Sequence, residues 1–319
     1  MLASPDFVNP FSTPLFNALL GRLLIFYAIA GFLILALTYR KGLAHLRNSN
    51  LGLRYIGWLL LTPLYLVGVF CGRIPGIAIT MLFVVGAVLE YSKIAKLPTS
   101  FRVGMVIAAL WSVITAAYFT AYFYSLPLVY FLIFTALAIR QNNVKTSFSS
   151  ASHAIYGSIW LGFSLSHIVL LSEFNNSLDH SRILPFLVLF AVACADIGGY
   201  VFGKLFHKLG ILDKYKVAKQ LSPNKTYVGT LGYIIGAGLA IWVLYFGLHQ
   251  YLSPVLWGIV AVIIGVFAFV GGLTHSFFKR YFNVKDSGTL IPGHGGVIDR
   301  VDSIARVVVI LYYFLRLAI

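Results

Sequence analysis

Two aspartates near the end of the sequence have the type and spacing that phosphate chemistry uses. Asp299 and Asp302 stand three residues apart, so on a helix both carboxylates lie on one face, with Arg306 a turn further along. The preceding stretch, GTLIPGHGG, is rich in glycine, which lets backbone amides approach an anion closely. Mg²⁺ binds a triphosphate through one or two carboxylates, phosphate oxygens and water, so this pattern predicts a metal–phosphate site. The alternative is that the aspartates only complement the positive end of a helix.

Basic residues near these aspartates supply the charge that a bound phosphate would meet. The cations are Lys279, Arg280, Lys285 and Arg300, with His294 as a further donor. A second segment, KQLSPNKTYVGTLG, places Lys225 and Thr226 at the start of an apolar run, after a turn predicted at 222–224. A lysine and backbone amides at a helix start form a natural phosphate site. A lysine at a membrane edge is more often only an anchor, so this segment alone is a weak signal.

Two further carboxylates lie in or beside apolar runs. Asp196, in ACADIGGYVFGKLF, sits well inside one, where a charge is costly and normally faces a polar cavity or a partner. We expect a functional role for Asp196, with a structural salt bridge as the alternative. Gly198, Gly199 and Gly203 near it predict a close helix approach or an irregular backbone. Glu90 is the only acid in the apolar runs before residue 173, and its place at the end of a run favours an interfacial, solvated carboxylate.

Membrane helices must position these residues. The 319-residue chain is 60 % hydrophobic and only 10 % charged, with a mean hydropathy of +0.89, whereas a soluble domain carries about 25 % charged residues. Long apolar runs recur along the chain, which predicts an all-α polytopic integral membrane protein with about ten transmembrane helices. The expected spans are 15–39, 55–72, 74–91, 103–120, 122–139, 154–172, 183–202, 228–248, 254–273 and 303–319.

The loops alternate in charge, and this alternation predicts the topology. Every second loop is basic and those between are short or nearly neutral, so the basic loops are expected to be cytoplasmic and both termini non-cytoplasmic. The two longest polar segments, 203–227 and 274–302, then share the cytoplasmic face. We divide the chain into a transmembrane scaffold of about six helices, 1–182, and a region that carries the chemistry, 183–319.

The net charge of +15 does not indicate nucleic acid binding. In a chain of membrane spans, basic residues mark cytoplasmic loops and contacts with anionic headgroups or phosphates. No soluble nucleic-acid-binding module is recognisable, so we expect no nucleic acid partner. The two cysteines, Cys71 and Cys194, lie in apolar runs and are interpreted as core residues rather than as a disulfide or zinc site.

The region from 276 to 302 resembles a known signature. Its pattern, S-x-x-K-R-x4-K-D-S-G-x3-P-G-H-G-G-x-x-D-R-x-D, looks like that of phosphatidate cytidylyltransferases, also called CDP-diacylglycerol synthases. The segments ADIGGYVFGKLF and LSPNKT are also similar to blocks of that family, so the resemblance covers roughly 190–319. It implies a multi-span helical fold and one Mg²⁺-dependent reaction: the phosphate of phosphatidic acid attacks the α-phosphorus of CTP, giving CDP-diacylglycerol and pyrophosphate.

The resemblance also implies roles for individual residues. Those carried over as catalytic are Asp286, Lys285, Asp299 and Asp302, and the expected metal ligands are Asp196, Asp299 and Asp302. The expected substrate contacts are Ser222, Lys225, Thr226, Ser276, Lys279, Arg280, Ser287, Gly293, His294, Gly295, Gly296 and Arg300. The expected partners are CTP, a membrane lipid phosphate and the lipid bilayer, with a homodimer as a candidate assembly. The expected location is the bacterial inner membrane, with the active site on its cytoplasmic face.

Three carboxylates of the family pattern are replaced. The family's G-D-L-x-E-S reads GGLTHS here, and its K-T-W-E-G reads KTYVG, so Gly272, His275 and Val228 stand where acids are usual. His275 is interpreted as a substitution, a candidate phosphate contact and not a new metal site, because neutral histidine is a poor ligand for magnesium. The leading prediction is an active cytidylyltransferase on a lipid phosphate. The alternatives are a catalytically impaired paralogue that binds nucleotide or lipid, or regulates a partner enzyme, and a transporter or scramblase.

Overall fold

The computed structural model describes residues 5–38, 50–174, 182–208, 216–218, 220–284, 287–288 and 295–319. In these ranges helices dominate, because a backbone inside a bilayer must satisfy its own hydrogen bonds. The helices are η1 (Pro10–Ser12), α1 (Pro14–Thr38), α3 (Asn50–Phe70), α4 (Arg73–Ile94), α5 (Thr99–Tyr118), α6 (Thr120–Phe123), α7 (Leu126–Gln141), α8 (Val144–Gly157), η3 (Ser158–Phe163), α9 (Ser164–Ser172), α10 (Ile183–Lys208), α11 (Tyr227–Leu248), α12 (Pro254–Tyr281), α13 (Ile298–Val301) and α14 (Ile304–Ala318).

The helices agree with the predicted membrane spans. Among the described residues, seven helical segments are long and apolar enough to cross a bilayer: they lie in α1, α4, α5, the continuous run α8–η3–α9, α10, α11 and α12. The predicted spans 55–72 and 122–139 coincide with the shorter apolar stretches Tyr55–Phe70 of α3 and Leu126–Gln141 of α7, and the span 303–319 coincides with α14. The prediction of an all-α polytopic membrane protein is confirmed, while the number of about ten spans stays a prediction.

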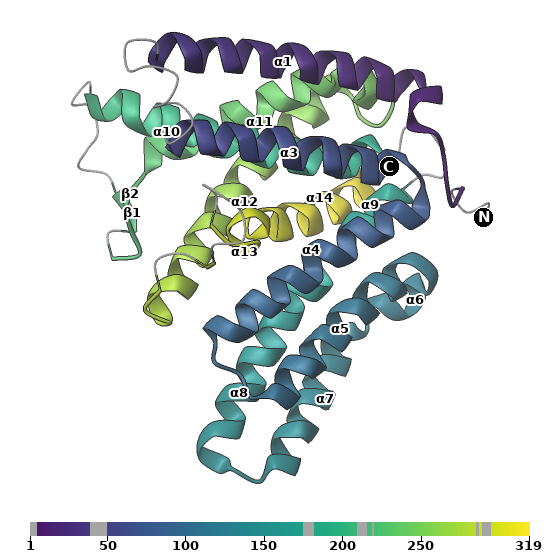
Figure 1. The fold of residues 1–319 in the computed structure, drawn as a ribbon, viewed down its shortest axis with the longest axis vertical. Coiled ribbons are helices and arrows are strands. Elements are labelled where there is room, and N and C mark those ends of the chain that lie inside the picture. The colour runs from purple at the N-terminus through teal and green to yellow at the C-terminus, as the bar shows by residue number, and fades with distance from the viewer. Residues whose placement is uncertain are drawn as a thin grey trace.

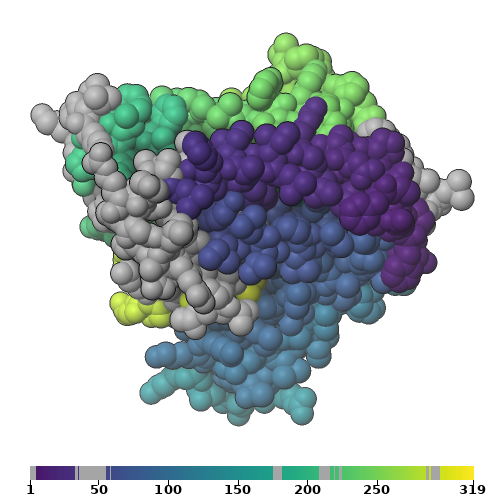
Figure 2. Space-filling model, turned by 45° about the horizontal axis from the view of Figure 1, so that its top comes forward, coloured from purple at the N-terminus to yellow at the C-terminus, as the bar shows by residue number. Residues whose placement is uncertain are grey.

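The helices form two packed groups that meet at α4, α9 and α13. Figure 1 shows α10, α11, α12 and α14 on one side, and α4, α5, α7 and α8 on the other. The groups are joined where α9 packs against α10 and α14, and where the short α13 packs against α4. Figure 2 shows α1 along the outside of the molecule, over α3. The predicted division at residue 182 therefore separates segments that are in direct contact.

Glycines allow α10 and α11 to approach backbone to backbone. A Cβ on Gly198 would collide with the carbonyl oxygen of Gly232, and a Cβ on Gly232 would collide with that of Gly198. A Cβ on Gly199 would meet the ring of Tyr233. The predicted close approach is thus confirmed at Gly198 and Gly199 but wrong at Gly203, where a Cβ would meet nothing within 4 Å.

The two ends of the molecule differ in character. Figure 1 places the N- and C-termini at one end, and the strands β1 (Lys216–Ala218) and β2 (Ser222–Thr226) at the other. The strands pair antiparallel, with Lys216 opposite Thr226 and Ala218 opposite Ser222. This arrangement agrees with termini on one membrane face and the polar segment 203–227 on the opposite face, although which face is cytoplasmic stays a prediction.

Two local predictions at this end are wrong. The turn predicted at 222–224 is part of β2, because pairing with β1 extends the backbone there and moves the turn back to Gln220 and Leu221. The predicted loop 274–302 begins later than expected, since α12 continues as a helix to Tyr281. That extension carries α12 past its apolar part and places polar side chains on a helix instead of a loop.

Candidate active site

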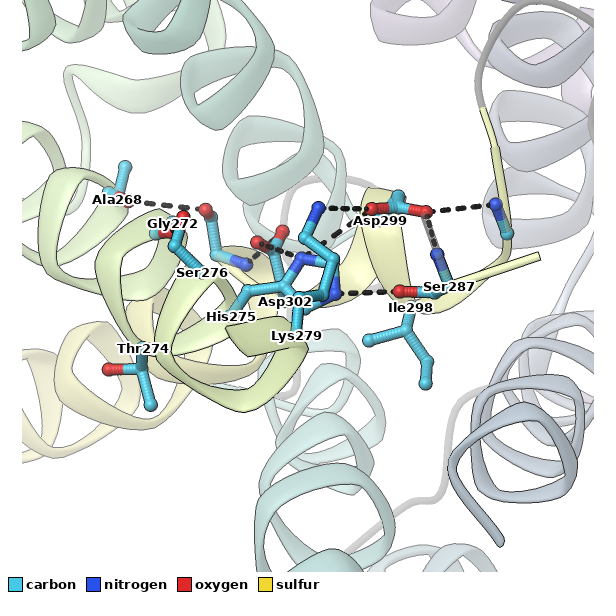
Figure 3. Close-up of polar contacts among 12 residues, drawn as sticks. Ala268, Gly272, Thr274, His275, Ser276, Lys279, Ser287, Ile298, Asp299 and Asp302 are labelled. Atoms are coloured by element: carbon cyan, nitrogen blue, oxygen red, sulfur yellow. Dashed lines mark hydrogen bonds and ion pairs between the residues drawn. The ribbon is translucent and has the colours of Figure 1, made fainter. Parts of the chain in front are cut away.

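The end of α12 and the short α13 supply the centre of the site. Ser253 caps α12 by accepting a hydrogen bond from the backbone N–H of Leu256, and Pro254 follows at the first helical position, where it is tolerated. His275 and Lys279 lie four residues apart near the other end of α12, so both point to the same side. Figure 3 shows them facing the two aspartates of the α13 region.

Asp299 fastens the glycine-rich segment to α12. Its Oδ1 accepts a hydrogen bond from Lys279 Nζ at 2.9 Å, and its Oδ2 accepts from the backbone N–H of Ser287 and of Gly296, each at 3.0 Å (Figure 3). Gly295 has a φ of +80°, and a Cβ there would lie 2.6 Å from Asp299 Oδ2, so the turn needs glycine. The carboxylate therefore ties together a helix, Ser287 and the end of the glycine-rich segment.

The electrostatic balance favours an ionised Asp299. Burial raises the pKa of this carboxyl, but the charge of Lys279, the N–H of Gly296 and the neighbouring His275 outweigh burial and hold the pKa below its usual range. Charged hydrogen bonds of this kind are the strong ones in proteins. Asp299 is thus anionic at neutral pH and binds the segment firmly.

His275 bridges α12, Ser287 and α13. Its Nδ1 lies 3.0 Å from Asp302 Oδ2, its Nε2 lies 2.7 Å from Ser287 Oγ, and the residue is only 3 % exposed. Both ring nitrogens are therefore engaged inside the protein. The interpretation of His275 as a phosphate contact is not supported by this geometry, because no nitrogen is left to face a ligand.

Asp302 completes the centre on the side of α14. Its Oδ1 accepts from the backbone N–H of Ser303 at 2.7 Å, and its Oδ2 faces His275. The same His275 nitrogen lies 3.7 Å from Asp299 Oδ1. The prediction that both carboxylates share one face is confirmed, since both approach the same nitrogen of His275. The alternative, that the aspartates only complement a helix N-terminus, is not supported for Asp299, because it accepts from the N–H of Ser287 and Gly296, outside α13.

Glu90 is a residue that sequence reasoning missed. It lies near the end of α4, and its Oε2 accepts from the backbone N–H of Ile298, the first residue of α13, at 3.0 Å. A Cβ on Gly288 would lie 2.9 Å from Glu90 Oε1, and one on Gly296 would overlap the carboxylate. The interpretation of Glu90 as an interfacial, solvated carboxylate is wrong, because its carboxylate packs on the glycine-rich segment.

Lys225 occupies the place beside Gly272. A Cβ on Gly272 would lie 2.5 Å from Lys225 Nζ, which donates to the carbonyl oxygen of Phe269 at 3.2 Å. Burial holds the pKa of Lys225 below its ordinary value, against the opposite effect of the Asp196 and Asp302 carboxylates. The Lys225 ammonium therefore lies beside Gly272, the position at which the family pattern has an aspartate.

Asp196 faces this same group of charges from α10. The Tyr233 hydroxyl donates a hydrogen bond to it, and the charges of Asp302, Lys225 and Arg300 all act on it. Its side chain is exposed although it belongs to a membrane-length helix. Asp196 therefore interacts with charged residues of the site, while its functional role and its role as a metal ligand stay predictions.

The other predicted residues differ in how close they lie to this centre. Thr226 caps α11 by accepting from the backbone N–H of Gly229 at 3.1 Å, and Ser276 Oγ donates to the carbonyl of Gly272 at 2.8 Å. Ser222 begins β2, and Arg280 is exposed at the end of α12. Arg300 lies on α13, between the aspartates. Lys285, Asp286, Gly293 and His294 lie outside the described residues.

The residues present suit a magnesium ion as a minimal set. Within the described ranges, no group of three or more His, Cys, Asp or Glu residues forms a metal site by itself. Asp302 and Asp196 nevertheless place two carboxylates close enough for their charges to interact, with Lys225 beside them. Mg²⁺ takes one or two carboxylates and completes its shell with phosphate oxygens and water, so this oxygen set fits it.

Several known bacterial proteins have similar sequences, and the chain spans less than two thirds of the length of most of them. Phosphatidate cytidylyltransferase of Staphylococcus haemolyticus is 38 % identical over 132 residues, which are 41 % of this chain and 47 % of the relative. The enzyme of the same name from Rickettsia bellii is 31 % identical over 208 residues, 63 % of this chain and 86 % of the relative. Uncharacterized protein YnbB of Escherichia coli is 32 % identical over 195 residues, 60 % of this chain and 62 % of that protein.

The family match is broader than these alignments. The model of the cytidylyltransferase family matches residues 52–318, so it includes α4 with Glu90 as well as the glycine-rich segment and both aspartates. It also extends well beyond the region 190–319 in which the sequence itself shows a resemblance. The chain therefore belongs to the cytidylyltransferase family.

Proposed function

We propose that this protein transfers a cytidylyl group from CTP to a membrane lipid phosphate, phosphatidic acid or a similar lipid, in phospholipid biosynthesis. An oxygen of the lipid phosphate attacks the α-phosphorus of CTP, the bond from that phosphorus to the bridging oxygen of the β-phosphate breaks, and pyrophosphate leaves. The product is a CDP-diacylglycerol-type lipid. The observation that carries the proposal is that Asp299 binds Lys279 and the backbone N–H groups of Ser287 and Gly296. These contacts hold the end of the glycine-rich segment near the cations Lys279 and Lys225.

The residues of the site suit this reaction, which depends on positioning and charge rather than on a covalent nucleophile. Lys279 and Lys225 are the cations that would neutralise the triphosphate, and backbone N–H groups of the glycine-rich segment would bind its oxygens. The attacking phosphate is already an anion, so no strong general base is required. Asp299 and His275 hold the parts together instead of taking part in proton transfer.

Magnesium is part of the proposal. Asp302 and Asp196, with Asp299 as the third predicted ligand, would hold one ion against the phosphates of CTP, and the bound ion would neutralise charge on those phosphates. His275 is not among these ligands, because both its ring nitrogens are already engaged.

The location and the partners follow from the same reasoning. We place the active site on the cytoplasmic face of a bacterial inner membrane, since the basic loops fit that face and the similar enzymes come from bacteria. CTP would arrive from the cytoplasm and the lipid phosphate from the bilayer. A homodimer is the proposed assembly, and the particle mass in detergent measures it.

A second candidate function rests on the three missing carboxylates. With Gly272, His275 and Val228 at positions where the family has acids, the chain would bind CTP or lipid without turnover, or regulate a partner enzyme. Nucleotide binding in the absence of product would favour this candidate over the first.

The deciding experiment is formation of a CDP-lipid by the purified protein in detergent, with CTP, Mg²⁺ and a panel of lipid phosphates. Asp299→Asn should remove most of the activity, because the neutral side chain weakens both the Lys279 pair and the two backbone contacts. Asp6→Asn is the matched control, since Asp6 is an exposed acid outside the site. Absence of product from every lipid phosphate, or equal activity in the Asp299 variant, refutes the proposal.

A further inference from the structure

The long helical run α8–η3–α9 changes its winding where it packs against α14. Its middle part, η3 (Ser158–Phe163), is a π-helix, whereas α8 before it and α9 after it are α-helical. Segments of π-helix are rare and occur frequently at functional sites. Trp160 lies in this segment and is only 5 % exposed, so its indole ring is enclosed by the protein.

The Trp160 ring contacts two residues that hold Asp302. The guanidinium carbon of Arg306 lies 5.3 Å from the centre of the indole ring, within the range of a cation–π interaction. The imidazole of His275 lies 6.3 Å from the same ring, measured between ring centres. Arg306 Nη1 donates to the backbone carbonyl of Asp302 at 3.2 Å, and His275 Nδ1 lies 3.0 Å from Asp302 Oδ2. Trp160 therefore packs on one support of the Asp302 backbone and on one support of its side chain.

Further aromatic rings fix the orientation of Trp160. The ring of Tyr156, four residues earlier in the chain, lies 5.6 Å from it, and the Tyr156 hydroxyl also interacts with the Arg306 guanidinium. Phe278 of α12 and Tyr91 of α4 lie 5.6 and 6.2 Å away, at interplanar angles of 70° and 85°. Such edge-to-face arrangements are favoured between aromatic rings. These contacts come from α8, α12 and α4, and together they hold the indole in one orientation.

The indole N–H of Trp160 is buried and makes no hydrogen bond within the described part of the chain. A buried indole N–H usually finds a partner. The contacts that place this side chain are therefore those of its ring, and a smaller ring at this position keeps part of them.

We propose that Trp160 is a positioning residue that fixes Asp302 for the metal–triphosphate, acting through Arg306 and His275. This inference rests on the proposed function, in which Asp302 is a ligand of the magnesium ion. Residues around a metal ligand orient it, and their loss lowers metal affinity or activity by roughly 10- to 100-fold. The segment 1–182, expected to be only a scaffold, thus contributes directly to the geometry of the site.

Two substitutions at this position separate the ring from the rest of the side chain. Trp160→Leu removes the aromatic face that Arg306 contacts, so kcat/KM should fall roughly 5- to 30-fold, the scale of a desolvated cation–π interaction. The Mg²⁺ concentration at half-maximal activity should rise by a similar factor. Trp160→Phe keeps a ring and loses an N–H without a partner, so both values should stay within about threefold of the wild type. Trp111→Leu is the matched control, because Trp111 of α5 is 50 % exposed and lies outside this cluster.

A double-mutant cycle tests the route through Arg306. Arg306→Met removes the cation, so Trp160→Leu should lower kcat/KM by at most about threefold in that background, where only the His275 contact remains to be lost. Effects of the two substitutions that multiply independently would overturn the inference.

The magnesium dependence separates positioning from damage to the fold. A variant that folds poorly has fewer active molecules, which lowers the apparent kcat and leaves the half-saturating Mg²⁺ concentration unchanged. That result for Trp160→Leu would overturn the inference, as would activity within about twofold of the wild type. A Trp160→Phe variant as impaired as Trp160→Leu would overturn it too.

Metal binding tests the inference without turnover. If the wild-type protein forms no CDP-lipid, the proposed function fails, and binding of Mn²⁺ in the presence of CTP then decides, measured by electron paramagnetic resonance on the protein in detergent. The dissociation constant of Mn²⁺ should rise roughly 5- to 30-fold in Trp160→Leu and change by less than about threefold in Trp160→Phe. An unchanged constant in Trp160→Leu, or a wild-type protein that binds no Mn²⁺, overturns the inference.

Discussion

The contact between Glu90 and Ile298 allows a quantitative prediction for a residue outside the glycine-rich segment. Glu90→Ala removes the acceptor of the Ile298 N–H, which lies 3.0 Å from Glu90 Oε2 at the start of α13. A hydrogen bond to a charged group contributes about 1.5–3 kcal/mol. If that free energy holds α13 and the glycine-rich segment in place, the substitution should lower kcat/KM by roughly 10- to 150-fold.

Two companion variants make this prediction specific. Glu90→Gln keeps a neutral acceptor, so kcat/KM should fall by about 4- to 12-fold, because a neutral hydrogen bond contributes roughly half as much free energy. Gly296→Ala should be severely impaired in the wild-type background, since its Cβ would overlap the Glu90 carboxylate. The same Gly296→Ala change should be milder in the Glu90→Ala background, where that overlap no longer exists.

The assay is CTP-dependent CDP-lipid formation with kcat and KM measured for both substrates, together with a thermal melt of each variant. Glu173→Ala serves as control, because Glu173 is a partly buried acid that pairs with Arg73, 3.6 Å away, outside the site. Activity of Glu90→Ala within twofold of the wild type would refute the reasoning. An equal effect of Gly296→Ala in both backgrounds would refute it too.

Three further predictions concern charge and packing. The pKa of Asp299 is lowered in the folded protein, so its stabilisation is present above the ordinary value of 3.8 and is lost as the pH falls through the lower folded value. Lys279→Met should move this loss to higher pH, seen in melting temperatures between about pH 2 and 5. An unchanged profile would contradict the Lys279 pair. Gly272→Asp should pair with Lys225 and raise CDP-lipid formation severalfold at low magnesium. If the protein is an impaired paralogue, the double change with His275→Glu should create activity. No effect of either change would show that the missing acids do not limit the activity. Gly198→Ala should destabilise the protein by about 1–3 kcal/mol through overpacking. Gly203→Ala on the same helix should leave the stability unchanged, since a Cβ at Gly203 meets nothing within 4 Å. Equal melting temperatures of the two variants would refute the close packing of α10 on α11.

The features that sequence reasoning predicted are those with a local physical signal. Apolar runs of membrane length predict the helices because a bilayer leaves the backbone no other solution. The spacing of Asp299 and Asp302 predicts a shared face because one helical turn brings such residues together, and both approach His275. Gly198 and Gly199 predict a close contact because they lack a Cβ.

The features that were missed depend on partners distant in the sequence. Glu90 accepts from Ile298, 208 residues away, and nothing in its own surroundings distinguishes it from a solvated carboxylate. The segment 222–224 has the residues of a turn, but its conformation is set by pairing with β1. The sequence shows that His275 replaces an acid of the family pattern. Only the fold shows that Asp302 and Ser287 contact its two ring nitrogens.

The contact of α4 with α13 also decides how this protein can be recombined with its relatives. A chimaera joined near residue 182 would combine the glycine-rich segment of one parent with the α4 of the other, so its Glu90 position would meet a foreign loop. Exchange of the C-terminal half alone should therefore give poorly active hybrids unless both parents carry the same residue at this position. Transfer of α4 together with that half keeps Glu90 and the glycine-rich segment from one parent. The segments that must be exchanged together are therefore separated in the chain.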